Sequence, residues 1–194
     1  MKNWYTKKNG GMTYVELIVV LSIFSVTTSI VLFNYGGFQA KVDIKVLAND
    51  IALKIVEAQK SAVAGVWNAA ALPTWKPSYG VNFDSSPGNN QKFIYFADLN
   101  NNSLYEDVGC AGECLSQINI TKDNSVSELA VFGGGCPATV TNLNIVFKRP
   151  DSGAIITSSP ALACSVSYVQ ITITSPKSVS AKLKIYPSGR IQIN

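Results

Sequence analysis

One carboxylate, Glu16, stands at the start of a long uncharged stretch that runs from Leu17 to Ala40. A charged side chain in a membrane helix costs roughly 2.5–3.5 kcal/mol on insertion scales, so it needs a neutralising partner. The cheapest partner is a free amino group, and cleavage after Gly11 would create one on Met12. We therefore expect Glu16 of one chain to pair with the amine of a neighbour during assembly. The alternative is that Glu16 lies solvated at the level of the lipid headgroups.

The uncharged stretch is long enough to cross a bilayer. Its 24 residues extend roughly 36 Å as a helix, against a hydrocarbon core of about 30 Å. A secretory signal peptide would have a shorter apolar region and a small-residue cleavage site after it, and no clear site of that kind follows. An ordinary membrane anchor accounts for the length but explains neither Glu16 nor the glycine before Met12.

The N-terminal segment resembles the class III signal of type IV pilins and type II secretion pseudopilins. That pattern is a basic leader, a glycine, Phe or Met, Thr, two mostly apolar residues and Glu, matched here by Lys7-Lys8, Gly11, Met12, Thr13, Tyr14, Val15 and Glu16. The resemblance implies that a prepilin peptidase cuts after Gly11 and that the Met12 amine is methylated. It also implies pairing of Glu16 with other pilin or pseudopilin subunits.

Composition fits a small membrane-anchored protein. The chain has 194 residues and a formal charge of +4 from 16 basic and 12 acidic residues. Three of the basic residues are leader lysines, so 13 remain against 12 acidic ones and the mature chain is nearly neutral. Under the positive-inside rule the leader stays cytoplasmic. We expect a cleaved leader at 1–11, a transmembrane assembly segment at 12–40, an amphipathic segment at 41–65 and an extracytoplasmic β-rich domain at 66–194, in a single-pass protein of the inner membrane.

The helical pattern continues beyond the apolar stretch. Small and apolar residues recur every three or four positions, which marks one face of a helix: Ile44, Leu47, Ile51, Ile55, Ala58 and Ala62. We predict one helix from about Thr13 to about Ala64. Gly36 and Gly37 lie inside it and would either loosen or kink the helix or allow a second helix to pack closely.

Short β-prone segments separated by turn residues follow the helix. The predicted strands are Tyr79–Phe83, Lys92–Ala97, Ile118–Thr121, Glu128–Phe132, Leu143–Lys148, Ala154–Ser158, Tyr168–Thr174 and Ala181–Tyr186, with a last hairpin around Pro187-Ser188-Gly189. The stretch 133–138 is predicted to be a loop. In Tyr168–Thr174 the polar and apolar residues alternate, so one face should be packed and the other wet. This order predicts an α+β protein with a long helix packed on an antiparallel sheet, as in the pilin fold.

Four cysteines, Cys110, Cys114, Cys136 and Cys164, lie in the part placed outside the membrane. An even number in an oxidising compartment favours disulfides, with three possible connectivities. Pairing of Cys110 with Cys114 and of Cys136 with Cys164 is one guess. A zinc site and reduced buried thiols are the alternatives, although the spacing does not match paired zinc knuckles.

Oxygen donors cluster in one turn, at Asp98, Asn100, Asn102 and Glu106. Their spacing resembles a calcium-binding loop but lacks the glycine and the distal glutamate of an EF-hand. Asp and Asn also dominate ordinary turns because they bond the local backbone. We favour the turn, keep calcium as a candidate ligand, and expect no cofactor.

The globular part weakly resembles the pseudopilin H and FimT-like branch, through Gln59-Lys60, Phe96-Ala97-Asp98 and Gly189-Arg190-Ile191. That likeness favours a minor subunit. FimT-like pilins are associated with DNA uptake through basic C-terminal residues, represented here by Lys182, Lys184 and Arg190. Phosphate binding relies on several cations together, and lysines on a strand are usually a solvated edge, so nucleic acid is not the expected partner.

An enzyme is not expected, because the chain has no histidine. Catalytic triads that use histidine and zinc motifs that contain histidine are therefore excluded. A cysteine nucleophile would lack its histidine base. The leading hypothesis is a structural subunit of a type IV pilus, or of a type II secretion pseudopilus, that serves protein secretion, DNA uptake or adhesion. The second hypothesis is a membrane-anchored binding module that recognises DNA or a secreted substrate.

Overall fold

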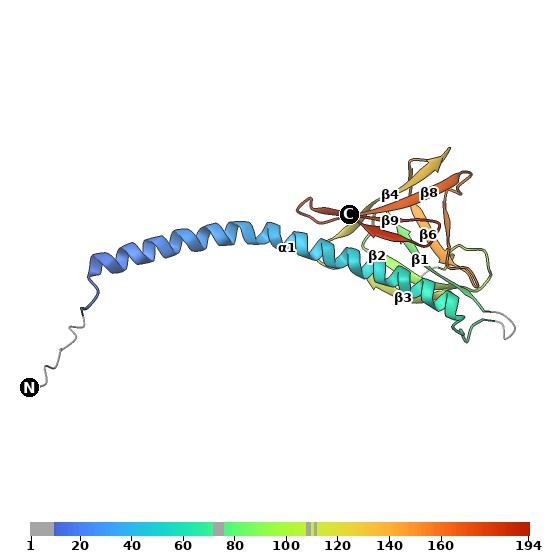
Figure 1. The fold of residues 1–194 in the computed structure, drawn as a ribbon, viewed down its shortest axis with the longest axis horizontal. Coiled ribbons are helices and arrows are strands. Elements are labelled where there is room, and N and C mark those ends of the chain that lie inside the picture. Colours follow the sequence, from blue (N-terminus) through green and yellow to red (C-terminus); the bar gives the residue numbers. More distant parts are fainter. Residues whose placement is uncertain (1–9, 72–75, 108–109, 111) are drawn as a thin grey trace, which may run out of the picture. The chain divides into compact units, whose positions relative to one another are not determined.

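In the computed structural model, residues 10–71, 76–107, 110 and 112–194 are described; most of the expected leader, residues 1–9, lies outside them. The chain forms two compact units, 1–39 and 40–194. A single helix, α1 (Tyr14–Ala64), supplies the described helical part of the first unit and continues into the second. Within the described residues, ten strands follow it, so the predicted α+β class is confirmed (Figure 1).

Both ends of α1 carry recognisable caps. At the start, the hydroxyl of Thr13 accepts a hydrogen bond from the amide of Glu16. At the end, Gly65 adopts a φ of 59°, its amide donates to the carbonyl of Ala62, and the amide of Val66 donates to the carbonyl of Ser61. This pair of bonds is a Schellman motif, in which a residue with positive φ closes the helix. The predicted end near Ala64 is therefore set by the glycine that follows it.

The second half of α1 is amphipathic as predicted. Its inward residues are almost completely buried: Ile44, Ala48, Ile51, Ile55, Ala58 and Ala62 are each at most 1% exposed. They share one hydrophobic core with side chains of the β-strands, which include Phe83, Phe93, Leu129 and Ile171. The packed face of α1 therefore consists of three isoleucines and three alanines.

The strands form two antiparallel sheets, where the sequence predicted one. The first sheet has the order β3-β2-β1-β6-β7 and the second the order β10-β9-β8-β4-β5. Their bounds are β1 (Ser78–Asp84), β2 (Lys92–Asp98), β3 (Cys114–Asn119), β4 (Ser125–Gly134), β5 (Thr139–Val140), β6 (Asn142–Phe147), β7 (Ala154–Ser159), β8 (Ser165–Thr174), β9 (Ser180–Ile185) and β10 (Ile191–Ile193).

Three local predictions were wrong. Strand β3 begins at Cys114, earlier than expected, and β4 extends to Gly134, into the first two residues of the stretch predicted to be a loop. The polar face of β8 is not wet, since Gln170 and Thr172 are 8% and 7% exposed. The reason is that β8 is a central strand. Lys184 lies opposite Gln170 and Lys182 lies opposite Thr172, so the long lysine side chains cover the polar face of β8.

Polar contacts fasten the second half of α1 to the strands. The hydroxyl of Tyr95 in β2 donates to the hydroxyl of Ser61 at 3.0 Å. Lys122, which follows β3, pairs with Asp43 at 2.7 Å. Near the helix end, the side-chain amide of Gln59 donates to the carbonyl of Ser152 at 2.8 Å. These bonds fix how α1 is rotated against the core within the unit 40–194.

Candidate functional site

The segment around Glu16 is the start of α1 and is exposed on every side. Gly10 and Gly11 have no other atoms within 4 Å of where a side chain would begin, and Met12 is 61% exposed. Glu16 lies in the first helical turn, three residues after the capping Thr13. A threonine cap followed three residues later by Glu, before an apolar run, is a capping-box pattern that the sequence reading did not use.

The apolar part of α1 has the character of a membrane span. One 18-residue window has a mean hydropathy of 2.3, and none of that window is buried by other described residues. Large side chains such as Phe24 and Phe33 are 65% and 86% exposed. A water-exposed helix of this composition would be unstable, which supports a single-pass membrane anchor.

Gly36 and Gly37 both lie within α1, and the helix is continuous through them. A side chain at Gly37 would meet nothing within 4 Å among the described residues. Packing among the residues that the structure describes therefore does not require a glycine at position 37. The predicted kink and the predicted close contact with a second helix both remain predictions.

The cysteines are joined in pairs, Cys110 to Cys114 and Cys136 to Cys164. The second bond connects the turn after β4 to the residue before β8, 28 residues along the chain. It therefore holds together the ends of the two most extensively paired strands of the second sheet. All four sulfurs are used in these bonds.

The Asx-rich turn after β2 is organised by its own backbone. Asp98 is completely buried, and its carboxylate accepts hydrogen bonds from the amides of Asn102 at 3.1 Å and Ser103 at 2.9 Å. The side-chain oxygen of Asn102 accepts from the amide of Leu104. The side-chain amide of Asn100 donates a hydrogen bond to the side-chain carboxylate of Glu106.

These bonds engage oxygen atoms of Asp98, Asn102 and Glu106 within the turn itself. Among the described residues, no group of three or more Asp, Glu, Cys or His side chains is arranged to hold a metal. The four candidates thus form a hydrogen-bonded turn in this structure, as the local chemistry of Asp and Asn favours.

Glu113 is a buried acid that the sequence reading missed. It is 7% exposed, and one of its oxygens accepts a hydrogen bond from the amide of Leu99 at 3.0 Å. Burial raises the pKa of Glu113, and the nearby carboxylates of Asp98 and Asp107 raise it further, against the lowering effect of the Leu99 amide. The only sequence signal was its position beside Cys114, inside an irregular loop.

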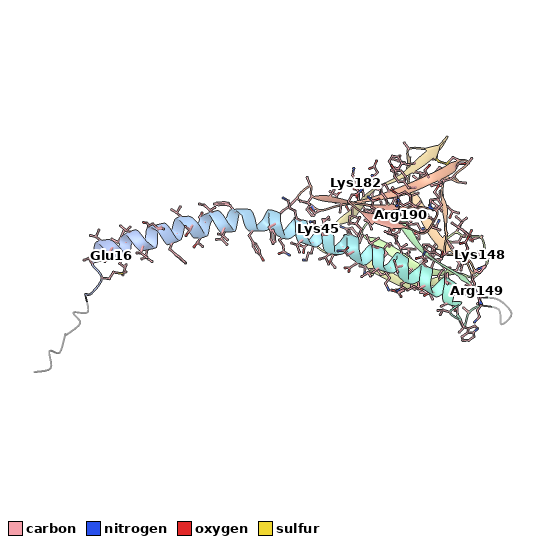
Figure 2. The ribbon with its side chains drawn as sticks, in the orientation of Figure 1. Glu16, Lys45, Lys148, Arg149, Lys182 and Arg190 are labelled. Atoms are coloured by element: carbon pink, nitrogen blue, oxygen red, sulfur yellow. A yellow bond between two sulfur atoms is a disulfide. The ribbon has the colours of Figure 1, made fainter. Side chains whose placement is uncertain are left out.

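Two basic residues near the C-terminus, Lys184 and Arg190, lie over tyrosine rings. The guanidinium of Arg190 is 4.0 Å from the ring centre of Tyr186, and the ammonium of Lys184 is 5.1 Å from that of Tyr168. Tyr168 also stacks on Phe132, with ring centres 4.5 Å apart. Strand β9, which carries Lys182 (labelled in Figure 2) and Lys184, lies between β8 and β10. The expectation that these lysines lie on a sheet edge was therefore wrong.

Comparisons of the chain with protein-family models, with curated proteins and with solved structures found no match.

Proposed function

We propose that this chain is a pilin-like structural subunit, a minor pilin or minor pseudopilin, that assembles into a type IV pilus or a type II secretion pseudopilus. The observation that carries the proposal is the position of Glu16. It is a lone carboxylate in the first turn of an exposed apolar helix. The same helix continues into a half that is packed on a β-domain. In a simple anchor Glu16 would serve only to cap the helix, whereas in an assembling helix it would also pair with a charge on a neighbouring chain.

In this proposal, the peptidase cuts the exposed link between Gly11 and Met12. Most of the leader is on the cytoplasmic side, and the β-domain is outside the inner membrane. The apolar half of α1 holds the subunit in the bilayer and later lines the core of a periplasmic or extracellular filament. Glu16 then pairs with the methylated amine of a neighbouring subunit, which removes the cost of an unpaired charge in an apolar surrounding.

The first test is the mass of the mature protein. Expressed with a prepilin peptidase, the chain should lose residues 1–11 and gain one methyl group on Met12, and without the peptidase it should do neither. Gly11→Val should block cleavage, because the peptidase must fit the residue before the bond. Gly10→Val is the matched control, since both glycines stand in open space.

The second test is recovery of the mature chain in sheared or purified filaments of a host that assembles them. Processed protein that never enters filaments, although it is present in the membrane, would refute the structural role. It would leave the membrane-anchored binding module as the remaining reading. A mature chain that begins elsewhere than at Met12 would refute the proposal at its first step.

A further inference from the structure

A groove opens beside α1 immediately after the apolar stretch. It has a volume of about 590 Å³ and lies wholly within the unit 40–194, between α1 and the strands β9 and β10. Its helix wall is formed by Lys41, Ile44, Lys45 and Asn49, which are spaced three and four apart and so share one face. A cavity of this size is in the usual range for small ligands.

The wall of the groove opposite the helix is mostly apolar. It is formed by Val179, Ser180, Ala181, Ile193 and Asn194. Ile44 and Ala181 are 1% and 6% exposed and form the floor, while Ile193 is 39% exposed at the rim. The groove therefore combines a hydrophobic floor with two cations on one side.

Charges on this part of α1 are sorted between two faces. Lys41 and Lys45 line the groove, whereas Asp43 and Asp50 line a separate hollow together with Lys122. The salt bridges within the described residues join Lys122 to Asp43 and Lys54 to Glu57, and neither uses a groove lysine. No Asp or Glu side chain is among the described residues that line the groove. Lys41 and Lys45 thus bring two positive charges to the helix wall of an otherwise largely apolar groove.

Chain position places these two lysines at the membrane surface. Lys41 directly follows the last residue of the uncharged stretch, and Lys45, labelled in Figure 2, is one helical turn further on. At 1.5 Å per residue, Lys45 is only about 8 Å along the helix from Ala40. The headgroup region on each side of a bilayer is about 5–7 Å thick. Lys41 therefore lies within the headgroup region, and the long side chain of Lys45 can reach back to it, since helical side chains lean toward the N-terminus.

We propose that this groove binds one anionic phospholipid of the surrounding leaflet. The phosphodiester pairs with Lys41 and Lys45, and the glycerol and upper acyl carbons lie against Ile44, Ala181 and Ile193. Charge complementarity and continuity with the membrane segment together select this ligand over a neutral lipid. The inference rests on the membrane anchoring contained in the proposed function, and it does not depend on filament assembly.

The test uses the full chain in nanodiscs that contain phosphatidylglycerol and phosphatidylcholine in equal amounts. Native mass spectrometry then counts the lipids retained on the protein. Wild-type protein should retain one phosphatidylglycerol in preference to phosphatidylcholine. Each lysine near an anionic membrane surface raises the binding constant about fivefold. Removing two of them in K41Q/K45Q should therefore lower the retention of phosphatidylglycerol at least tenfold. Ile193→Ser should also weaken it while leaving the charge unchanged.

The matched control is K60Q/K148Q, which removes the same charge from exposed lysines outside the groove. Lys60 is about 30 Å along the helix from Ala40, well beyond the Debye length of about 8–10 Å, so this variant should behave as wild type. Equal retention by K41Q/K45Q and wild type would overturn the proposal. An equal loss of retention in K60Q/K148Q would also overturn it. So would a result in which inorganic phosphate releases the bound lipid at the same concentration as free lipid does. Failure to enter nanodiscs would instead refute the membrane anchoring itself.

Discussion

Thr13 and Glu16 form the N-terminal cap of α1, with the hydroxyl of Thr13 accepting the amide N–H of Glu16 at 3.3 Å. A negative charge in the first helical turn also interacts favourably with the helix dipole. Glu16 therefore has a local role in starting the helix, besides the assembly role proposed for it. Any test of the assembly role must separate the two.

Glu16→Gln separates them, because glutamine can still serve in a capping box but carries no charge. We expect recovery of the variant in filaments to fall at least tenfold, which corresponds to losing about 1.4 kcal/mol or more of pairing. The measurement is the amount of subunit in sheared filaments relative to the amount in the membrane. Thr13→Val removes the cap for about 1 kcal/mol and keeps the charge, so its filament recovery should stay close to normal. Normal assembly of Glu16→Gln would contradict the pairing.

Ile51 and Leu53 test the packed face of α1. Ile51 is completely buried and Leu53 is 66% exposed, only two residues away on the same helix. Ile51→Ala should lower the free energy of unfolding by about 2–5 kcal/mol through lost burial and a residual cavity. Leu53→Ala should change it by less than about 0.5 kcal/mol. Chemical denaturation of the full chain in detergent measures both, and equal losses would mean that the buried face is wrongly assigned.

Gly189 is required by the last hairpin for two reasons. It has a φ of 81°, and a side chain there would begin 2.4 Å from the carbonyl oxygen of Ser152 and 2.5 Å from the amide of Gln59. Gly189→Ala should destabilise the protein by about 2–4 kcal/mol. Gly88→Ala is the control, since Gly88 has a φ of 89° but open space around it, and should cost about 1 kcal/mol. The difference between the two melting curves isolates the steric contact.

Glu113 should make stability depend on pH. Because its pKa is raised in the folded state, folding favours the protonated form. Stability from this group is full below the pKa of the unfolded chain and decreases as pH rises through the folded pKa. Glu113→Gln should abolish that decrease and raise the melting temperature at neutral pH. Glu128→Gln, at an exposed position, serves as the control; a wild-type-like pH profile in Glu113→Gln would rule out this assignment.

Calcium should not stabilise the turn after β2, because Asp98 already accepts two backbone amides. We expect no change in melting temperature on adding millimolar calcium. Asp98→Ala should nevertheless destabilise the protein by about 1–3 kcal/mol, since it removes the acceptor of the Ser103 amide and one of the two acceptors of the Asn102 amide. A calcium-dependent rise in melting temperature that disappears in Asp98→Ala would restore the cation site.

Sequence periodicity was most informative where contacts are local. The helix stripe at Ile44, Ile51 and Ile55 was predictable because every residue of a helix is placed by its neighbours within one turn. The hairpin of β9 and β10 was predictable from its Pro-Ser-Gly turn for the same reason. Two features of strand pairing were not predictable: the division into two sheets, and the burial of Gln170 and Thr172.

The candidate site shows the same division. The carboxylate at Glu16, the glycine before Met12 and the uncharged stretch are properties of consecutive residues, so the chain by itself determined the apolar helix and the place where it begins. Only the tertiary structure decided that Glu113 is buried and that Lys41 and Lys45 share a groove with Ile193. Those relationships join residues up to about 150 positions apart, and no local pattern specifies them because long-range pairing depends on the packing of the whole core.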